Sequence, residues 1–398
     1  MIYKEFKNLK LSTLGFGIMR LPTKGKSEQV NVEESVELIE YAYKNGINFF
    51  DTAYFYHGGE SEVVLGKTLA QFPRDTWYIS DKMPGNFIEI EDGKIKLDVG
   101  WSGIETRVFN NVGEVFEHQL RVCGVDYFDF YMLHNVTEST FELYTDEKLG
   151  IVSYLVEQRK AGRIRHLGFS THARYETIDK FLNIYDCFEY ALMQLNYLDW
   201  SLQEGNKKYD VFTKHGLPIF VMEPARGGML AAPGDEAEAK LKAARPNDTP
   251  ASWAFRFLQS LPNVQVVVSG MTTKEQMIEN IETFSKADPM TDSEKKVLQD
   301  IVENMASFVP CTTCRYCCGV CPKKLDIPML IAIYNEATHG VSWYVEDVLE
   351  TLADDKKPQA CIGCGVCNPL CPQNIDIAET MVSFCKLLEK KDEENKDS

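Results

Sequence analysis

The chain has 398 residues, an apolar content of 44% and a formal net charge of −17, which together indicate a globular protein of two to three domains. The negative charge argues against binding to nucleic acid or to anionic membranes, because both need a basic surface. No run approaches the ~18 apolar residues of a membrane helix, and the N-terminus shows no signal-peptide core, so we expect a cytoplasmic protein.

Eight short apolar runs alternate with amphipathic segments over the first 290 residues. The expected strands are Ser12–Met19, Ile47–Asp51, Trp77–Lys82, Tyr127–His134, Ile164–Ser170, Tyr190–Asn196, Ile219–Glu223 and Gln265–Gly270. Strands that are apolar on both faces and alternate with helices indicate a parallel sheet. Eight such units in ~250 residues predict a closed (β/α)8 TIM barrel. A doubly wound sheet is the alternative, but its glycine-rich G-x-G-x-x-G turn is missing after the first strand.

Helices are expected between these strands. Apolar residues at helical spacing mark two of them, with Val32, Val36, Ile39 and Tyr43 in the first and Ile104, Val108, Val112 and Val115 in the second. A capping box, Thr272-x-x-Glu275, predicts the start of the last barrel helix. A second box, Thr291-x-x-Glu294, predicts a linker helix beyond a domain boundary near 290.

Four polar residues stand at or just after the ends of three predicted strands. Asp51 ends INFFD, Tyr56 follows in the loop, Lys82 ends WYISDK and His134 ends YFDFYMLH. Each alone is a weak signal, since a strand-end aspartate often caps a helix and a lone lysine is usually solvated. Catalytic residues of a barrel lie at the carboxyl ends of its strands, so the four together predict an active site.

The chemistry of this set follows from its ionisable groups. A tyrosine has a pKa of ~10, and a buried ammonium from Lys82 beside Tyr56 is expected to lower that pKa. Asp51 is expected to pair with Lys82 and orient it. His134 is expected to donate a hydrogen bond to a substrate carbonyl oxygen while Tyr56 protonates the developing alkoxide.

These residues stand in segments that resemble the aldo-keto reductases, NAD(P)H-dependent barrel enzymes. GINFFDTAYFY (46–56) matches the family's D-T-A-x-x-Y segment, and ISDKMP (79–84) and YMLHNV (131–136) are similar to its lysine and histidine segments. The stretches GFS (168–170), QLNYL (194–198), MEPARGG (222–228) and SGMTTKEQMIEN (269–280) resemble its cofactor-binding stretches. The resemblance covers residues 11–285 with every motif in order, and it implies Tyr56 as the general acid.

The same resemblance implies a nucleotide site. Its expected contacts are Ser170, Gln194, Asn196, Met222, Glu223, Gly270, Met271, Lys274, Gln276, Glu279 and Asn280. Among these, Ser170 and Gln194 are placed near the nicotinamide carboxamide, and Glu279 with Asn280 near the adenine. Met222 stands where many members carry an aromatic ring that stacks on the nicotinamide. Lys274 is the nearest cation for a 2′-phosphate, so NADPH is expected, with NADH as the alternative.

A long loop, residues 83–103, follows Lys82 and carries Phe87, Ile88 and Trp101. Loops that follow barrel strands often carry function, so this loop is expected to line the substrate mouth. A surface hairpin is the alternative.

Two cysteine runs near the C-terminus share the pattern C-x2-C-x2-C-x3-C-P. They comprise Cys311, Cys314, Cys317 and Cys321 before Pro322, and Cys361, Cys364, Cys367 and Cys371 before Pro372. This spacing is that of two-cluster bacterial ferredoxins, in which the fourth cysteine of each run binds the other cluster. Structural zinc sites instead join two C-x2-C pairs across a loop, and disulfides do not suit a reducing compartment. We therefore expect two [4Fe–4S] clusters.

The swap predicts one cluster on Cys311, Cys314, Cys317 and Cys371 and another on Cys361, Cys364, Cys367 and Cys321. Cys318, Cys123, Cys187 and Cys385 are interpreted as small buried side chains. Residues 322–360 have a helical pattern, with Met329 and Ile333 in one segment and Trp343–Leu352 in another, which resembles an α-helical ferredoxin. The expected domains are a barrel at 1–290, a linker helix and cluster domain at 291–388 and a charged tail at 389–398.

The two halves present an electronic problem, because a hydride carries two electrons and a cluster passes one. A carbonyl reductase of the aldo-keto reductase type, with clusters that are structural or exchange electrons with a ferredoxin, is the first hypothesis. An electron-transfer protein with a nucleotide or flavin in its barrel is the second, and a redox sensor is the third. The set of Asp51, Tyr56, Lys82 and His134 favours the first, because a carrier or sensor needs no tuned acid.

Overall fold

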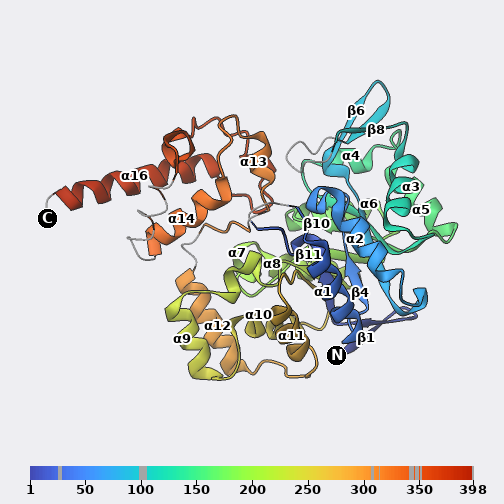
Figure 1. Ribbon diagram of the computed structural model, residues 1–398, viewed down its shortest axis with the longest axis horizontal. Coiled ribbons are helices and arrows are strands. Elements are labelled where there is room, and N and C mark those ends of the chain that lie inside the picture. The colour runs from blue at the N-terminus through green and yellow to red at the C-terminus, as the bar shows by residue number, and fades with distance from the viewer. Residues whose placement is uncertain are drawn as a thin grey trace. The chain divides into compact units, whose positions relative to one another are not determined.

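The computed structural model describes residues 1–25, 29–97, 105–305, 309–312, 314–339, 345, 349 and 352–396. The chain divides into two compact units, Met1–Val302 and Glu303–Ser398 (Figure 1). No helix in the described part of the chain is long and apolar enough to cross a membrane.

The first unit is a closed barrel of eight parallel strands in the order β10-β11-β12-β13-β3-β4-β5-β9. Their bounds are Leu14–Gly17 (β3), Phe49–Asp51 (β4), Tyr78–Met83 (β5), Phe128–Val136 (β9), Ile164–Thr171 (β10), Tyr190–Gln194 (β11), Ile219–Met222 (β12) and Val264–Ser269 (β13). Each overlaps the run predicted for it, and nearly every residue in them is buried. The (β/α)8 barrel is therefore confirmed.

Helices pack around the barrel (Figure 1). The longer ones are α1 (Val32–Lys44), α2 (Glu60–Leu69), α3 (Val112–Cys123), α5 (Ile151–Lys160), α6 (Tyr175–Ile184), α8 (Gly205–Lys214), α9 (Asp235–Ala244), α10 (Pro250–Gln259), α11 (Lys274–Thr283) and α12 (Asp292–Met305). Two short helices, α4 (Phe141–Thr145) and α7 (Asp199–Leu202), lie in loops. The spacing predicted from Val32 to Tyr43 is confirmed by α1.

An antiparallel hairpin, β1 (Tyr3–Phe6) and β2 (Leu9–Ser12), precedes the first barrel strand. Its Phe6 ring lies 5.5 Å from the ring of Phe130 and 5.6 Å from that of Phe220. These rings belong to one buried apolar cluster inside the barrel. The hairpin therefore fills one end of the barrel with apolar side chains and leaves the carboxyl ends of the strands for polar groups.

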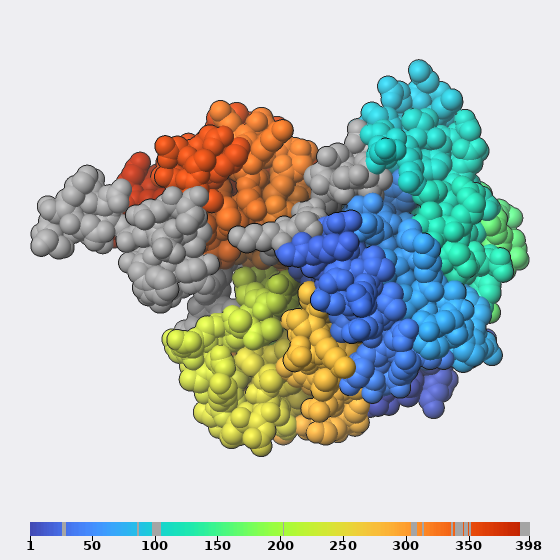
Figure 2. All heavy atoms as spheres, in the orientation of Figure 1, coloured from blue at the N-terminus to red at the C-terminus, as the bar shows by residue number. Residues whose placement is uncertain are grey.

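The loop after β5 forms a small antiparallel sheet of β6 (Ile88–Glu91), β7 (Lys94–Leu97) and β8 (Arg107–Phe109). Figure 2 shows it as a lobe that projects from the barrel unit. The helix expected from Ile104 to Val115 is wrong at Val108, which lies in β8 with its side chain 60% exposed. Helix α3 begins only at Val112. Ile104 and Trp101 lie outside the described residues.

One predicted capping box is confirmed and the other shifts by a residue. At the start of α12, Thr291 N donates to Glu294 Oε2 at 2.7 Å and Glu294 N donates to Thr291 Oγ1 at 3.3 Å. For α11 the box is formed by Thr273 and Gln276, not by Thr272 and Glu275. Gln276 is therefore occupied at the helix start, where it accepts from Thr272 N at 2.8 Å.

Helix α12, which the sequence placed beyond a boundary near 290, belongs mainly to the barrel unit. Its Glu294 accepts two hydrogen bonds of 3.2 Å from Arg256 of α10 and another from Arg245. These ion pairs fasten the first turns of the helix to the barrel, so the division falls after Val302.

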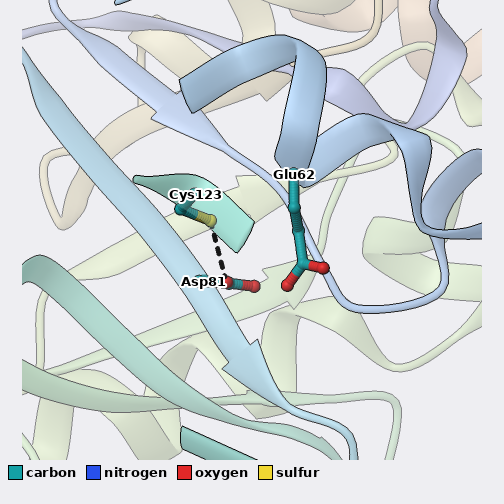
Figure 3. A group of neighbouring side chains, drawn as sticks. All are labelled: Glu62, Asp81 and Cys123. Carbon is teal, nitrogen blue, oxygen red and sulfur yellow. Dashed lines mark hydrogen bonds between the residues drawn. The ribbon is translucent and has the colours of Figure 1, made fainter. Parts of the chain in front are cut away.

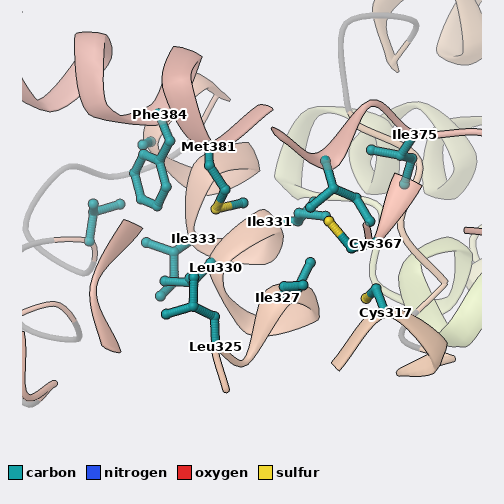
Figure 4. Packing of buried hydrophobic residues seen from close by; sticks show 13 residues of the cluster. Cys317, Leu325, Ile327, Leu330, Ile331, Ile333, Cys367, Ile375, Met381 and Phe384 are labelled. Carbon is teal, nitrogen blue, oxygen red and sulfur yellow. The ribbon is translucent and has the colours of Figure 1, made fainter. Parts of the chain in front are cut away.

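The second unit is mostly helical, with α13 (Tyr316–Val320), α14 (Ile327–His339) and α16 (Ile377–Lys396). Its core is formed by aliphatic side chains of α14 and α16 together with Cys317 and Cys367 (Figure 4). The rings of Tyr334 and Phe384 lie 5.6 Å apart between these two helices. The helix predicted at Met329 and Ile333 is confirmed. Most of the one predicted at Trp343–Leu352 lies outside the described residues.

Glu294→Gln tests how strongly α12 is held on the barrel. Despite its burial, hydrogen bonds from Arg256 and Arg245 lower the pKa of Glu294 to about 2. A depressed carboxyl pKa stabilises the fold above the unfolded value of 4.5, and this contribution is lost as the pH falls from there towards 2. We expect the variant to lose ~1–3 kcal/mol at neutral pH, measured by urea unfolding with tryptophan fluorescence, and to lose less on acidification than wild type.

Glu236→Gln is the matched control, because the pair of Glu236 with Lys240 on α9 is exposed and should contribute ~0–1 kcal/mol. Equal urea midpoints for the two variants would contradict a stabilising role for Glu294.

Candidate active site and iron–sulfur centre

The four polar residues predicted as catalytic meet at the carboxyl ends of the barrel strands. Asp51 ends β4, Lys82 is the penultimate residue of β5, and His134 lies near the end of β9. Tyr56 begins a 3-10 turn, η2 (Tyr56–Gly59), in the loop that follows β4. Because β4, β5 and β9 are neighbours in the barrel, their ends bring these side chains together.

The centre of the site is a buried ion pair. Lys82 Nζ donates to Asp51 Oδ2 at 2.6 Å and to the carbonyl oxygen of Thr52 at 2.5 Å. The side chains of Lys82 and Asp51 are 1% and 5% exposed. A charge taken out of water in this way needs a partner and further hydrogen bonds, and both are present.

Tyr56 lies over this pair, with Lys82 Nζ 4.9 Å from the centroid of its ring. The expectation that the pKa of Tyr56 lies below its usual value is wrong. Burial raises the pKa of this phenol well above its usual value, and the charges of Asp51 and Glu223 raise it further. The Tyr56 hydroxyl therefore keeps its proton and remains available as a donor.

His134 faces the same space, and its ring centroid lies 6.3 Å from that of Tyr56 at an interplanar angle of 87°. Burial, followed by the charge of Lys82 and by His172, lowers the pKa of His134 well below its usual value. The imidazole is therefore neutral near pH 7 and carries one N–H. This state suits a hydrogen-bond donor to a neutral carbonyl group.

Aromatic rings form a wall beside these groups. Phe55 stacks on His134 with centroids 5.0 Å apart and planes 13° apart. Phe87, from the long loop after β5, lies against Phe55 at 4.6 Å. This part of the loop contacts the site, while β6 and β7 form a surface hairpin, so each of the two interpretations of the loop applies to a different part of it.

Several buried polar atoms at this end of the barrel have no hydrogen-bond partner among the described residues, including Asp51 Oδ1, His134 Nδ1, Asn135 Oδ1 and Glu223 Oε2. Buried polar atoms are nearly always satisfied, so such a group at one place indicates a polar ligand. The carboxamide N–H groups of a nicotinamide can satisfy such oxygens, and a carbonyl oxygen can accept from an imidazole N–H.

The residues expected at the nicotinamide differ in the hydrogen bonds that they already make within the protein. Gln194 donates to Asp199 Oδ2 at 2.7 Å and is hydrogen-bonded to His172. Asn196 donates to Asp199 Oδ2 and to the carbonyl oxygen of Glu223, and its own oxygen accepts two backbone N–H groups. In this arrangement Asn196 has no donor left for a ligand. Ser170 Oγ accepts from Asn135 N at 2.8 Å.

Residues after β12 and β13 form another edge of the site. Met222 ends β12 opposite Gln194 and packs on the apolar core of the barrel. Glu223 has a left-handed backbone, with φ of 54°, and forms an ion pair of 3.7 Å with Arg20. Gly270 lies under Arg20, since an added Cβ would stand 3.1 Å from the carbons of that side chain.

The remaining predicted nucleotide contacts lie on or next to α11. Met271 is fully buried, and Asn280 donates to Ser269 Oγ at 3.4 Å. Glu279 accepts a hydrogen bond from Thr249, the N-cap of α10. Lys274 Nζ lies 5.2 Å from the ring centroid of Tyr41. Gln276 is occupied in the capping box. Lys274, also a predicted nucleotide contact, has a charged, exposed side chain that takes no part in this box.

Sequence reasoning missed two residues at this site. Arg20 follows β3, forms an ion pair with Glu223 and lies against Gly270. His172 follows β10, is hydrogen-bonded to Gln194 and contributes to the lowered pKa of His134. Burial lowers the pKa of His172 to about 3, so it too is neutral. Both stand directly after predicted strands, which is the signal that could have identified them.

The two cysteine runs repeat the same backbone conformation. Arg315 and Gly365, each one residue after the second cysteine, have φ of 65° and 72°. Lys324 and Asn374, each three residues after the fourth cysteine, have φ of 50° and 53°. The two runs therefore share these left-handed positions among the described residues, as two copies of one cluster-binding motif would.

The predicted exchange of the fourth cysteine stays a prediction, and the arrangement of one set of four cysteines supports it. Cys321 lines a pocket together with Cys361, Cys364 and Cys367. Apolar residues of α14 and α16 also line the pocket, including Ile327 and Met381. Four thiols around one pocket match the donor set of a [4Fe–4S] cluster.

For the other predicted cluster, Cys317 interacts with both Cys314 and Cys311. The hydrogen bond that Cys317 donates to Cys318, together with burial, raises the pKa of Cys317, and the neighbouring thiols raise it further. Helix α13 packs on η8 (Asn368–Leu370), the turn that leads to Cys371. The place of Cys371 in this set stays a prediction.

Cys318 occupies the place that Asn368 takes in the second run. Asn368 Oδ1 accepts the backbone N–H of Ile377 at 2.9 Å at the start of α16, and the sulfur of Cys318 accepts that of Ile327 at the start of α14. This contact agrees with a structural role for Cys318.

Two family models match the sequence, the Aldo/keto reductase family over residues 13–303 and a 4Fe-4S dicluster domain over residues 310–376. An NADH-specific methylglyoxal reductase from Escherichia coli is 22% identical over 67% of this chain and 87% of its own length. An uncharacterized oxidoreductase, YqkF, from Bacillus subtilis is 25% identical over 73% of this chain and 93% of its own. A probable aldo-keto reductase from Glycine max is 26% identical, and the match spans 57% of this chain and 60% of that protein.

Solved structures agree on the fold. The holo form of the aldo-keto reductase AKR11C1 from Bacillus halodurans superposes with a TM-score of 0.58 at 24% identity, covering 76% of this chain and 96% of that one. The thermostable aldo-keto reductase Tm1743 gives a TM-score of 0.59 at 21% identity, covering 76% of this chain and all of that one. The ordered strands, the meeting of their four polar residues and the family match lead to one conclusion: the chain belongs to the aldo/keto reductase family and carries a 4Fe-4S dicluster domain after its barrel.

Proposed function

We propose that the barrel reduces a carbonyl compound to an alcohol with NAD(P)H, and that the cluster domain exchanges single electrons with a partner protein. The observation that carries the first part is the buried pair of Lys82 and Asp51 beneath the Tyr56 ring, next to a neutral His134. A pure carrier or sensor of nucleotides does not need this arrangement.

When bound, the reduced nicotinamide supplies a hydride, two electrons and one hydrogen nucleus, to the carbonyl carbon. His134 donates a hydrogen bond to the carbonyl oxygen, which polarises the bond. Tyr56 transfers its hydroxyl proton to the same oxygen as negative charge develops there. Lys82, held by Asp51, stabilises the negative charge left on the phenol until solvent returns a proton.

The nucleotide is expected to be NADPH, with NADH as the alternative. Lys274 at the start of α11 and Arg20 beside Gly270 are the cations that support phosphate binding at this edge. The relative from Escherichia coli is an NADH-specific methylglyoxal reductase. Assays of carbonyl reduction should therefore include small aldehydes, with NADPH and with NADH. Titration of the anaerobically purified protein with each nucleotide distinguishes the two.

In the cluster domain, clusters when bound would store and pass single electrons. Cys364 is exposed, and beside it Ile362 and Val366 are 59% and 48% exposed. Lys323 lies on the rim of the same cavity, and Lys356 Nζ donates to the Lys323 carbonyl oxygen at 3.1 Å. Exposed apolar side chains beside Lys323 and Lys356 suit binding of an acidic carrier such as a ferredoxin.

The proposed location is the cytoplasm, because free thiols and clusters suit a reducing compartment.

The alternative function is an electron-transfer protein or redox sensor in which the barrel only binds a nucleotide. The exposed apolar rim around Cys364 favours it, because a purely structural cluster needs no such surface. A flavin absorbance in the purified protein supports the electron-transfer form. Tight nucleotide binding without turnover on any carbonyl supports the sensor.

Tyr56→Phe should lower the rate of aldehyde reduction by at least ~10²-fold, because the proton donor is lost. Nucleotide affinity and cluster absorbance should stay unchanged, since neither depends on the hydroxyl. In wild type, the raised pKa of Tyr56 keeps the acid protonated, so reduction should persist through about pH 9. Full activity in the variant would remove the acid assignment.

Cys364→Ala should reduce the iron and sulfide content by about half, since one of two clusters loses a ligand. Cys385→Ala is the matched control, because Cys385 lies in α16 outside both runs and should leave the content unchanged. We expect aldehyde reduction with NAD(P)H to survive in both variants. Loss of that activity in Cys364→Ala alone would show that the hydride step depends on the clusters.

Ile362→Asp should slow reduction of the cluster domain by a reduced ferredoxin by ~10-fold or more, because it places a charge in the apolar contact surface. Val382→Asp is the control, since Val382 is also exposed, at 42%, but lies outside the cavity. The measurement is stopped-flow bleaching of cluster absorbance. Equal rates for the two variants would exclude this rim as the contact surface.

A further inference from the structure

A group of buried ionisable side chains lies behind Lys82, on the outer side of β5. Asp81 projects from β5 to the opposite face from Lys82, because neighbouring side chains in a strand alternate. Glu62 from α2 and Cys123 from α3 converge on it (Figure 3). All three are at most 1% exposed.

Hydrogen bonds join this group into a network. Glu62 and Asp81 are hydrogen-bonded to each other through their carboxyl groups. Cys123 Sγ donates to Asp81 Oδ2 at 3.6 Å. Gln119 of α3 donates to Glu62 Oε1 at 3.1 Å, and Gln119 Oε1 accepts from Tyr131 at 2.5 Å.

The network holds the main chain of Lys82 from both directions. Lys82 N donates to Asp81 Oδ1 at 2.8 Å, and the carbonyl oxygen of Lys82 accepts from Gln119 Nε2 at 3.0 Å. The strand β4 ends opposite Ser80, two residues earlier. Beyond that point side chains take over the hydrogen bonds that a neighbouring strand would otherwise provide to the main chain.

Gly66 allows this arrangement. It lies one helical turn after Glu62 in α2, and a Cβ added there would stand 1.9 Å from the carbonyl oxygen of Cys123. Only glycine therefore lets α2 approach the end of α3 closely enough to bring Glu62 against Asp81.

We propose that Glu62 and Asp81 share one proton and act as positioning residues that hold the backbone of Lys82, and thus its ammonium, in place. This role rests on the carbonyl reduction proposed above. Two ionised carboxylates in contact would repel each other in a site without water, whereas one shared proton leaves a single compensated charge. Glu62 then donates to Asp81, and Asp81 accepts from Lys82.

The electrostatic environment agrees with this geometry. Burial raises the pKa of Asp81 to about 6, and burial followed by the charge of Asp81 raises that of Glu62 well above its usual value. Asp81 Oδ1 accepts the backbone N–H of Lys82, which favours the ionised form of Asp81 and leaves Glu62 as the carboxyl that keeps the proton. Since a displacement of ~1 Å can cost ~10²-fold in rate, fixing the Lys82 backbone has a large effect on turnover.

The kinetic test compares Glu62→Gln with Glu62→Leu. Glutamine keeps a donor for Asp81 and an acceptor for Gln119, so kcat should stay within ~2-fold of wild type. Leucine removes both, and kcat should fall by ~10²-fold with an unchanged Kd for the nucleotide. Equal kcat values for Glu62→Leu and wild type would overturn the positioning role.

Asp129→Asn separates positioning from stability. Asp129 is equally buried in β9 but pairs with Arg74 and Arg165, away from the site. It should lower the unfolding midpoint without lowering kcat. If it lowered kcat as much as Glu62→Leu does, the loss would reflect general destabilisation, and the positioning role would be rejected.

The shared proton has a readout that needs no turnover. At neutral pH, the infrared difference spectrum between wild type and Glu62→Gln should contain the carbonyl stretch of a protonated carboxylic acid. Absence of this band, or a stoichiometric divalent metal in wild type that Glu62→Leu loses, would overturn the proposal. If wild type reduces no carbonyl, the proposed function fails. The infrared spectrum still shows whether Glu62 and Asp81 share a proton.

Discussion

The buried ion pair between Lys82 and Asp51 is the interaction on which the rest of the site depends. An ammonium with 1% of its side chain exposed is stable there only because a carboxylate lies 2.6 Å away and a backbone carbonyl 2.5 Å away. Both partners stand at the ends of adjacent strands, so the register of the barrel fixes their separation. The fold therefore determines where the charges of Lys82 and Asp51 lie relative to Tyr56 and His134.

The same surroundings explain why the phenol of Tyr56, the proposed acid, is protonated. Burial raises the pKa of Tyr56, and the charges of Asp51 and Glu223 raise it further. A donor that keeps its proton matches the direction of carbonyl reduction, in which the oxygen gains a proton. The neutral His134 complements it, since a second cation beside Lys82 would be unfavourable.

The cluster domain has its own determinants. Its backbone repeats at Arg315 and Gly365 and again at Lys324 and Asn374, so the two loops follow from the repeated cysteine spacing. Its core consists of aliphatic side chains of α14 and α16 around Cys317 and Cys367 (Figure 4). Beside this core, Cys321, Cys361, Cys364 and Cys367 line one pocket, and Cys364 is exposed.

Much of the fold and of the catalytic set could be predicted from the sequence, because both are local signals. Each strand is a buried apolar run, and Asp51, Lys82 and His134 stand at the ends of such runs. The direction of the Tyr56 pKa could not be predicted, since it depends on which partner Lys82 takes. Val108 followed a helical spacing but lies in β8, because a small sheet competes for the same residues.

The full occupation of Asn196 and the contact of Glu62 with Asp81 depend on packing between distant segments, which spacing does not encode.

The most direct test of the account is single-turnover transfer of deuterium from the 4-deuterated reduced nicotinamide to an aldehyde carbon, in wild type and Lys82→Met. The account predicts deuterium in the wild-type alcohol and transfer at least ~10²-fold slower in the variant, at unchanged nucleotide affinity and iron content. Equal transfer rates, or an alcohol without deuterium from wild type, would contradict it.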